Sequence, residues 1–154
     1  MDLETLDHEP YIERALDLAR EAADRGDEPF GSLLVHDGEV VAEARNAVAT
    51  EGDLREHPEL TLATWAARER SAAERGETVM YTSTEPCAMC SGGIYHAGLG
   101  AVVYSTSAER VAEFTGRDFA VPSRDVFAYG DREVRVVGPV LPEAGADVHR
   151  DYWP

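Results

Sequence analysis

Residues 82–98 read TSTEPCAMCSGGIYHAG and hold the only two cysteines of this 154-residue chain, Cys87 and Cys90. The run TVMYTS at 78–83 has the apolar and β-branched composition of a short buried strand. A proline then opens a helix over 86–97, because proline suits the first turn of a helix. The spacing of three residues places both sulfurs in that first turn, on one face.

Two cysteines at this spacing can form a redox pair, a part of a metal site or a packing contact. The N-terminus, MDLETLDHEP, is acidic and has no apolar stretch, so we expect no signal peptide. We therefore expect a cytoplasmic protein, in which a structural disulfide would be unusual. No apolar run approaches the length needed to span a bilayer, so no membrane partner is expected.

A histidine upstream completes a zinc site. A catalytic zinc ion takes three protein ligands and keeps a fourth position for water, so two cysteines are one ligand short. The sequence REHPEL supplies His57 at the start of a helix, and Glu59 follows two residues later. H-x-E upstream of P-C-x-x-C is the signature of the zinc-dependent base deaminases. In this interpretation Glu59 takes a proton from the attacking water and delivers it to the ring nitrogen and then to the leaving amine.

Two other interpretations of the cysteines stay open. A redox pair of the thioredoxin type does not require H-x-E on a preceding helix. A structural zinc site normally takes a fourth Cys or His, and the chain has no further cysteine. The other histidines are expected on the surface or in the core, rather than as ligands: His8, His36, His96 and His149.

The rest of the chain predicts a mixed α/β domain. Asp37-Gly38 is a strong hairpin signal between two strands within 32–44. The other expected elements are helices over 10–25, 58–75, 107–114 and 143–154, a polar loop over 47–56, strands over 101–105 and 133–140, and a turn-rich stretch over 115–132. This order predicts an α/β fold, a three-layer α-β-α sandwich around a mixed five-stranded sheet, formed by one domain over residues 1–154.

The chain is strongly acidic, with 30 Asp and Glu against 14 basic residues and a net charge of −16. All of the basic residues are arginine. Such a surface can be simply well solvated, or it can reflect adaptation to high salt, and the absence of lysine can also reflect a GC-rich genome. In each case the surface should repel phosphate backbones, so we expect no nucleic-acid partner.

These stretches resemble the cytidine-deaminase-like superfamily, in particular bacterial guanine deaminases and related nucleoside deaminases. The resemblance covers nearly the whole chain and is carried by three stretches: EPFGSLLVHDGEVVAEARN at 28–46, EPCAMCSGGIYHAG at 85–98 and GPVLPEAGADVHRDYW at 138–153. It implies that His57, Cys87 and Cys90 bind zinc and that Glu59 moves protons. It also implies a homodimer or larger assembly in which the C-terminal segment covers an active site.

The resemblance assigns three further residues. Asn46 matches an asparagine that reads the edge of the base, although a turn-forming asparagine is the plain alternative. Phe30 matches an aromatic residue near the base, or is an ordinary core residue. Asp118, in TGRDF, is the best candidate for a second acidic group that moves protons, or is a solvated turn residue.

Two residues depart from the family pattern. Pro58 stands between His57 and Glu59 where most relatives have alanine, and it removes a backbone N–H that could contact substrate. His96 replaces a tryptophan in the helix after the cysteines. We expect both to affect substrate recognition, so Pro58 is a candidate substrate-binding residue.

The sequence therefore predicts hydrolytic deamination of a free nucleobase or nucleoside, with guanine as first choice. The alternatives are cytosine or another small aminated ring, adenosine in tRNA, and a zinc-stabilised binding domain without catalysis. The intact Glu59 argues against the last, because zinc binding alone does not need that carboxylate.

Overall fold

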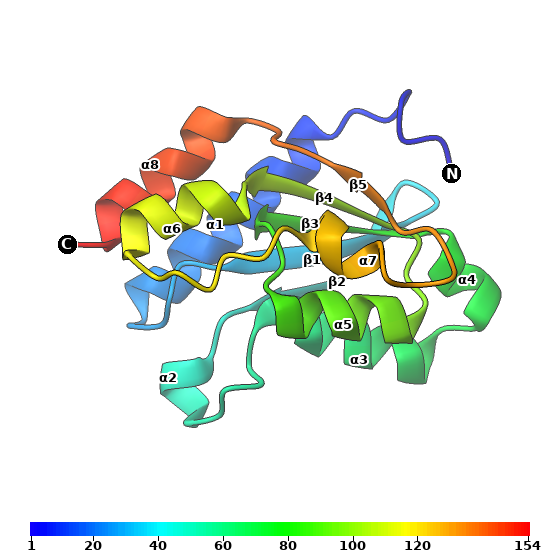
Figure 1. Cartoon of the computed structure of the whole chain (residues 1–154), viewed down its shortest axis with the longest axis horizontal. Coiled ribbons are helices and arrows are strands. Elements are labelled where there is room, and N and C mark those ends of the chain that lie inside the picture. The colour runs from blue at the N-terminus through cyan, green and yellow to red at the C-terminus, as the bar shows by residue number, and fades with distance from the viewer.

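A computed structural model describes all 154 residues as one sheet with helices on both faces (Figure 1). The elements are α1 (Glu9–Asp24), β1 (Gly31–His36), β2 (Glu39–Arg45), α2 (Val48–Glu51), α3 (Pro58–Glu69), α4 (Ala72–Gly76), β3 (Thr78–Thr84), α5 (Ala88–Ala97), β4 (Ala101–Thr106), α6 (Ala108–Thr115), α7 (Ser123–Phe127), β5 (Arg135–Val137) and α8 (Pro142–Tyr152). None of these helices combines the length and the apolar character that a membrane crossing requires.

The sheet has the strand order β2-β1-β3-β4-β5. β1 pairs antiparallel with both β2 and β3, whereas β3, β4 and β5 run parallel. The expected mixed five-stranded sheet is therefore confirmed. The hairpin turns at Asp37 and Gly38, which both adopt positive φ, as a tight Asp-Gly turn requires.

The strands alternate between two cores. On one face Leu33, Val35 and Tyr81 pack under α1 and α8. On the other face Leu34 and Met80 pack with residues of α3 and α5. Figure 1 shows α1 and α8 on one side of the sheet, and α3 and α5 on the other. Because side chains alternate along a strand, one run of apolar residues serves both layers.

Four stretches differ from expectation by more than one or two residues at an element end. The helix expected over 58–75 breaks after Glu69, because Arg70 is extended and Ser71 starts α4 with a capping box to Glu74. The loop over 47–56 contains the single turn α2, and the stretch over 115–132 contains α7. The last strand is only Arg135–Val137. Each difference involves a short element, for which the sequence pattern spans too few residues to be informative.

Gly31 is the point of closest approach between α1 and the sheet. A Cβ atom added there would lie 2.5 Å from Leu18 Cβ and 2.6 Å from the Ala15 carbonyl oxygen. A helix backbone cannot move away without disturbing the whole layer, so the site has no room for a side chain. Gly31 directly follows Phe30, and it thereby helps to fix the chain that leads into the site described below.

We predict that Gly31→Ala destabilises the protein by about 1–3 kcal/mol, the usual cost of overpacking. Gly92→Ala is the matched control, because a Cβ added at this position inside α5 meets no atom within 4 Å. Alanine should there be neutral or stabilise the helix by up to about 1 kcal/mol. Chemical denaturation of both variants measures the difference, and equal stabilities would contradict the close-approach explanation.

Candidate metal centre and active site

The N-termini of α3 and α5 meet at one edge of the sheet and bring the three predicted ligands together. His57 is the N-cap residue of α3, and Cys87 is the N-cap residue of α5. Cys90 lies one turn into α5 and is completely buried. Helix N-termini carry a partial positive charge that favours thiolates, so both helices assist the same cluster.

The spacing of the three ligand atoms fits a tetrahedral metal ion. His57 Nδ1 lies 3.7 Å from Cys87 Sγ and 3.5 Å from Cys90 Sγ. All three atoms lie within 4.8 Å of one another. Tetrahedral zinc with ordinary Zn–S and Zn–N bonds separates such N and S atoms by about 3.5–3.6 Å. The donor set and its spacing therefore fit zinc, with Nδ1 as the histidine ligand.

The three neighbouring groups shift one another's ionisation. The nearby Cys90 thiol and the contact from His57 Nδ1 lower the pKa of Cys87 to about 4. The neighbouring Cys87 sulfur, together with burial, raises the pKa of Cys90. The contact with Cys87 also raises the pKa of His57. Coordination to a dication would favour both thiolates.

Glu59 is buried beside the cluster, with only 6 % of its surface exposed. Burial raises the pKa of its carboxyl group to about 7, and the charge on Cys87 contributes. Glu59 and Pro58 both line a cavity of about 170 Å³ that is also bounded by His57 and Cys87. A group that can both accept and release a proton near neutral pH therefore faces the space next to the ligands.

The cavity is walled by residues from several elements. Its lining consists of Glu28, Phe30, His57, Pro58, Glu59, Thr84, Glu85, Cys87, Ala108, Val111, Ala112, Thr115, Arg117, Phe119 and Ala120. The predicted Phe30 is thus in the lining. The residues from 108 onward were missed by sequence reasoning, because their places depend on how α6 and the segment after it fold over the site.

Glu85 holds that wall in place. Its buried carboxylate accepts hydrogen bonds from the backbone N–H of Ala108, at 2.8 Å, and from the backbone N–H and hydroxyl of Ser123, at 2.8 and 2.6 Å. Glu85 stands two residues before Cys87, so one carboxylate ties the loop of this candidate ligand to the starts of α6 and α7. Glu85 is the first residue of the motif EPC. Its place beside Cys87 was the one sequence feature that could have indicated a role at the site.

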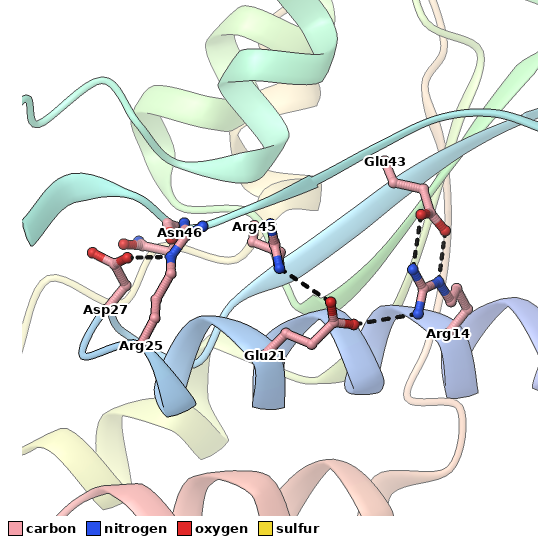
Figure 2. Close-up of polar contacts among 7 residues, drawn as sticks. All are labelled: Arg14, Glu21, Arg25, Asp27, Glu43, Arg45 and Asn46. Carbon is pink, nitrogen blue, oxygen red and sulfur yellow. Dashed lines mark hydrogen bonds and ion pairs between the residues drawn. The ribbon is translucent and has the colours of Figure 1, made fainter. Parts of the chain in front are cut away.

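Asn46 is buried at the end of β2 and is not part of the cavity lining (Figure 2). Its Oδ1 accepts a hydrogen bond from the N–H of Val48, and its backbone N–H donates to the carbonyl of Phe30. Its Nδ2 has no partner in the protein. The Asn46 side chain therefore forms the turn through Oδ1 and keeps a free hydrogen-bond donor at Nδ2.

One ion pair and several hydrogen bonds fix the backbone around Asn46 (Figure 2). Arg25 donates to the Asn46 carbonyl at 2.7 Å and to the carboxylate of Asp27 at 2.6 Å. Asp27 also accepts from the backbone N–H and hydroxyl of Thr50. Burial acts to raise the pKa of Asp27, but the bonds from Thr50 and Arg25 outweigh it and hold that pKa below its usual range. The loop that leads to His57 is thus anchored at its start.

Two expected residues lie away from the cavity. Asp118 is exposed, although its neighbours Arg117 and Phe119 both line the cavity. His96 is exposed on α5, where its ring meets the edge of Tyr95, so the expectation that this departure affects recognition finds no contact to support it. Sequence alignment gives the approximate region of such residues, whereas a shift by one residue decides whether a side chain points inward.

Comparisons with known proteins agree with this geometry. Guanine deaminase of Bacillus subtilis is 38% identical over 109 residues, 70% of either chain, and the probable cytosine deaminase of Schizosaccharomyces pombe is 31% identical over 149 residues, 93% of this chain and 90% of the relative. The solved guanine deaminase of Nitrosomonas europaea shares the fold, with a TM-score of 0.79 over 95% of this chain and 84% of that one at 19% identity. Residues 5–106 match the family described as the cytidine and deoxycytidylate deaminase zinc-binding region. The chain therefore belongs to this family of zinc-dependent deaminases.

Proposed function

We propose that this protein hydrolyses the exocyclic amine of a free nucleobase, with guanine as the first candidate, and releases ammonia. The observation that carries the proposal is the buried Glu59 carboxylate, which shares one small cavity with His57 and Cys87, two members of the cluster that the buried Cys90 completes. A zinc-stabilised binding domain would need the ligands but not this carboxylate, which is costly to bury.

The residues divide the chemistry between them. When bound, zinc supplies the Lewis acidity that makes water nucleophilic near neutral pH. We propose that Glu59 accepts a proton from the attacking water and delivers it to the ring nitrogen next to the reacting carbon. A second proton transfer to the amine lets ammonia leave, and the carbon keeps the oxygen. Glu59 can make both transfers, whereas the carboxylate of Glu85, which is also buried at the cavity, already accepts hydrogen bonds from Ala108 and Ser123.

The size of the cavity favours a free base. Its volume of about 170 Å³ is below the roughly 300–1,000 Å³ typical of sites for drug-sized ligands. Phe30, Val111 and Phe119 give it apolar walls, which suit the faces of a flat ring. A base without its sugar is therefore preferred over a nucleoside.

Asn46 favours a ring that presents a hydrogen-bond acceptor. Because Oδ1 is used by Val48, only the Nδ2 donor remains for a ligand. We propose that a small adjustment of the loop on binding brings this donor to the base. Guanine and cytosine both carry a ring carbonyl, which adenine lacks, and an unmet buried donor disfavours a ligand that leaves it unpaired. The relatives named above include enzymes for both of the favoured bases. The match to guanine deaminase is shorter but has the higher identity, 38% against 31%, which supports guanine as the first candidate.

The partners and the assembly are part of the proposal. A net charge of −16 opposes binding to a phosphate backbone, which supports a small-molecule substrate over tRNA. A homodimer and a cytoplasmic location follow from the family resemblance and the composition, and they stay predictions. Light scattering on the purified protein measures the assembly, and a screen for ammonia release from guanine, guanosine, cytosine, adenine, pterins and aminated triazines identifies the substrate.

The first functional prediction separates metal binding from proton transfer. Glu59→Gln keeps the shape of the side chain, so the protein should retain about one zinc per chain while its turnover falls by at least about 10²–10⁴. Elemental analysis and ammonia release measure the two quantities. Glu51→Gln, an exposed residue of α2, is the control and should leave both unchanged. Normal turnover in Glu59→Gln would rule out the mechanism, and zinc that survives in Cys87→Ala would rule out the ligand set.

The second functional prediction concerns Asn46. Asn46→Asp keeps the oxygen that accepts from Val48 but replaces the free donor with an acceptor. We expect kcat/KM for carbonyl-bearing bases to fall by about tenfold or more, since an unsatisfied buried group costs about 1–3 kcal/mol. Melting temperatures should show that the fold survives. If Asn46→Asp turns over guanine normally, Asn46 is only a turn residue.

The third functional prediction concerns tRNA. A gel shift with the zinc-loaded protein at moderate salt should show no complex, because acidic residues outnumber the arginines and the net charge of −16 repels a phosphate backbone. Tight binding that weakens steeply with added salt would restore the tRNA-editing alternative.

A further inference from the structure

His149 is a buried histidine that the proposed chemistry does not use. It lies in α8 with 1 % of its surface exposed. Its ring stacks on Phe114, with centroids 5.6 Å apart, and is tilted against Phe30 at 5.9 Å. Burial lowers the pKa of His149 to about 4, so the imidazole is neutral at physiological pH. A neutral imidazole has one N–H donor and one acceptor, and its surroundings decide which nitrogen is which.

Trp153, near the C-terminus, determines which nitrogen of His149 carries the proton. Trp153 Nε1 lies 2.9 Å from His149 Nδ1, and an indole N–H can only donate. His149 Nδ1 must therefore be the acceptor, and the single imidazole proton must sit on Nε2. Nε2 lies 2.9 Å from Thr84 Oγ1, so the histidine donates to the threonine hydroxyl.

Because the hydrogen bonds run from Trp153 to His149 and from His149 to Thr84, the hydroxyl hydrogen of Thr84 has no acceptor within this series. Thr84 Oγ1 has no other partner in the protein, so its own hydrogen is free. Thr84 ends β3, is 5 % exposed and lines the cavity that holds Glu59. We propose that Trp153 and His149 are positioning residues that fix the Thr84 hydroxyl as a hydrogen-bond donor to a ring acceptor of the base. This inference rests on the proposed function for the identity of the ligand.

Packing fixes the positions of the hydrogen-bonded side chains Trp153, His149 and Thr84. A Cβ added at Gly145 would lie 2.4 Å from the Ser105 hydroxyl oxygen, so α8 sits directly on the end of β4, one helical turn before His149. Arg117 lies over the Trp153 ring at 5.1 Å and pairs with Glu28. Because Arg117 and Glu28 also line the cavity, the indole is held by the wall of the site that its hydrogen bond serves.

The first experiment measures the tautomer of His149 in the zinc-loaded protein without ligand. Nitrogen-15 NMR at neutral pH should show the Nε2–H tautomer alone. In Trp153→Phe, which keeps a ring but removes the donor, we expect a mixture of tautomers. Tyr152→Phe is the control, since Tyr152 only packs edge-on against Trp153 and should leave the spectrum unchanged. A His149 that is Nδ1-protonated or charged in the unmodified protein would overturn the inference, whatever the substrate is.

The second experiment tests the donor role of Thr84 with guanine and three analogues that each lack one acceptor: 3-deazaguanine, 7-deazaguanine and 2-aminopurine. Dissociation constants are measured in the Glu59→Gln background, which does not turn the bases over. One analogue should bind about tenfold or more weakly than guanine, and this difference should disappear in Thr84→Val but persist in Thr84→Ser.

The outcomes are distinguishable from those of the proposed function. If every analogue shows the same losses in Thr84→Val as with threonine present, the hydroxyl does not donate to the base and the inference is wrong. If none of the purines binds, guanine is wrong as the substrate class, and the same cycle is then measured with cytosine and its 3-deaza analogue. The donor role is likewise overturned if Thr84→Val leaves unchanged the ratio of dissociation constants between base and analogue, both for the purines and for cytosine.

Discussion

The structure depends on one constraint. The N-termini of α3 and α5 must lie side by side and point toward two thiolates and a buried carboxylate. β3 leads directly into Cys87, and the anchored loop after β2 leads into His57. The cluster gathers negative charge in a place where water is scarce, which is unfavourable without a counter-charge. The helix dipoles supply part of that charge, and the ion supplies most of it. Metal binding and folding of this edge of the sheet are therefore coupled.

The grouping of the candidate site residues could be predicted from the sequence because it depends on two motifs with fixed local spacing. P-C-x-x-C fixes two sulfurs on one helical turn, and H-x-E fixes a ligand and a carboxylate on another. The alternation of Leu33, Leu34 and Val35 between two cores follows from the period of a strand. The Asp37-Gly38 turn follows from the positive φ that both residues tolerate. Each of these patterns is complete within about ten residues.

The walls of the cavity could not be predicted in the same way. Asp118 and Phe119 are neighbours, yet only Phe119 faces the cavity, because the segment after α6 is irregular and has no period to fix its inward face. His149 was expected on the surface or in the core, and it is in the core. Its partner Thr84 is 65 residues away in sequence, so the hydrogen bond between them depends on how α8 packs on β4. No local pattern records such a contact.

The polar groups around the cavity explain how a very acidic protein can accept an uncharged ring with exposed acceptors. Glu28 at the cavity is paired with Arg117, and Glu85 is satisfied by backbone and hydroxyl donors, so neither carboxylate needs the ligand. Donors without a partner in the protein include the Asn46 amide nitrogen, which lies outside the cavity lining, and, by the inference above, the Thr84 hydroxyl at the cavity wall. Two donors and one proton-carrying carboxylate complement a ring that offers acceptors at its edge and an amine at the reacting carbon. In the proposed function, the acidic surface governs what approaches the protein, whereas donors such as these govern which base is bound.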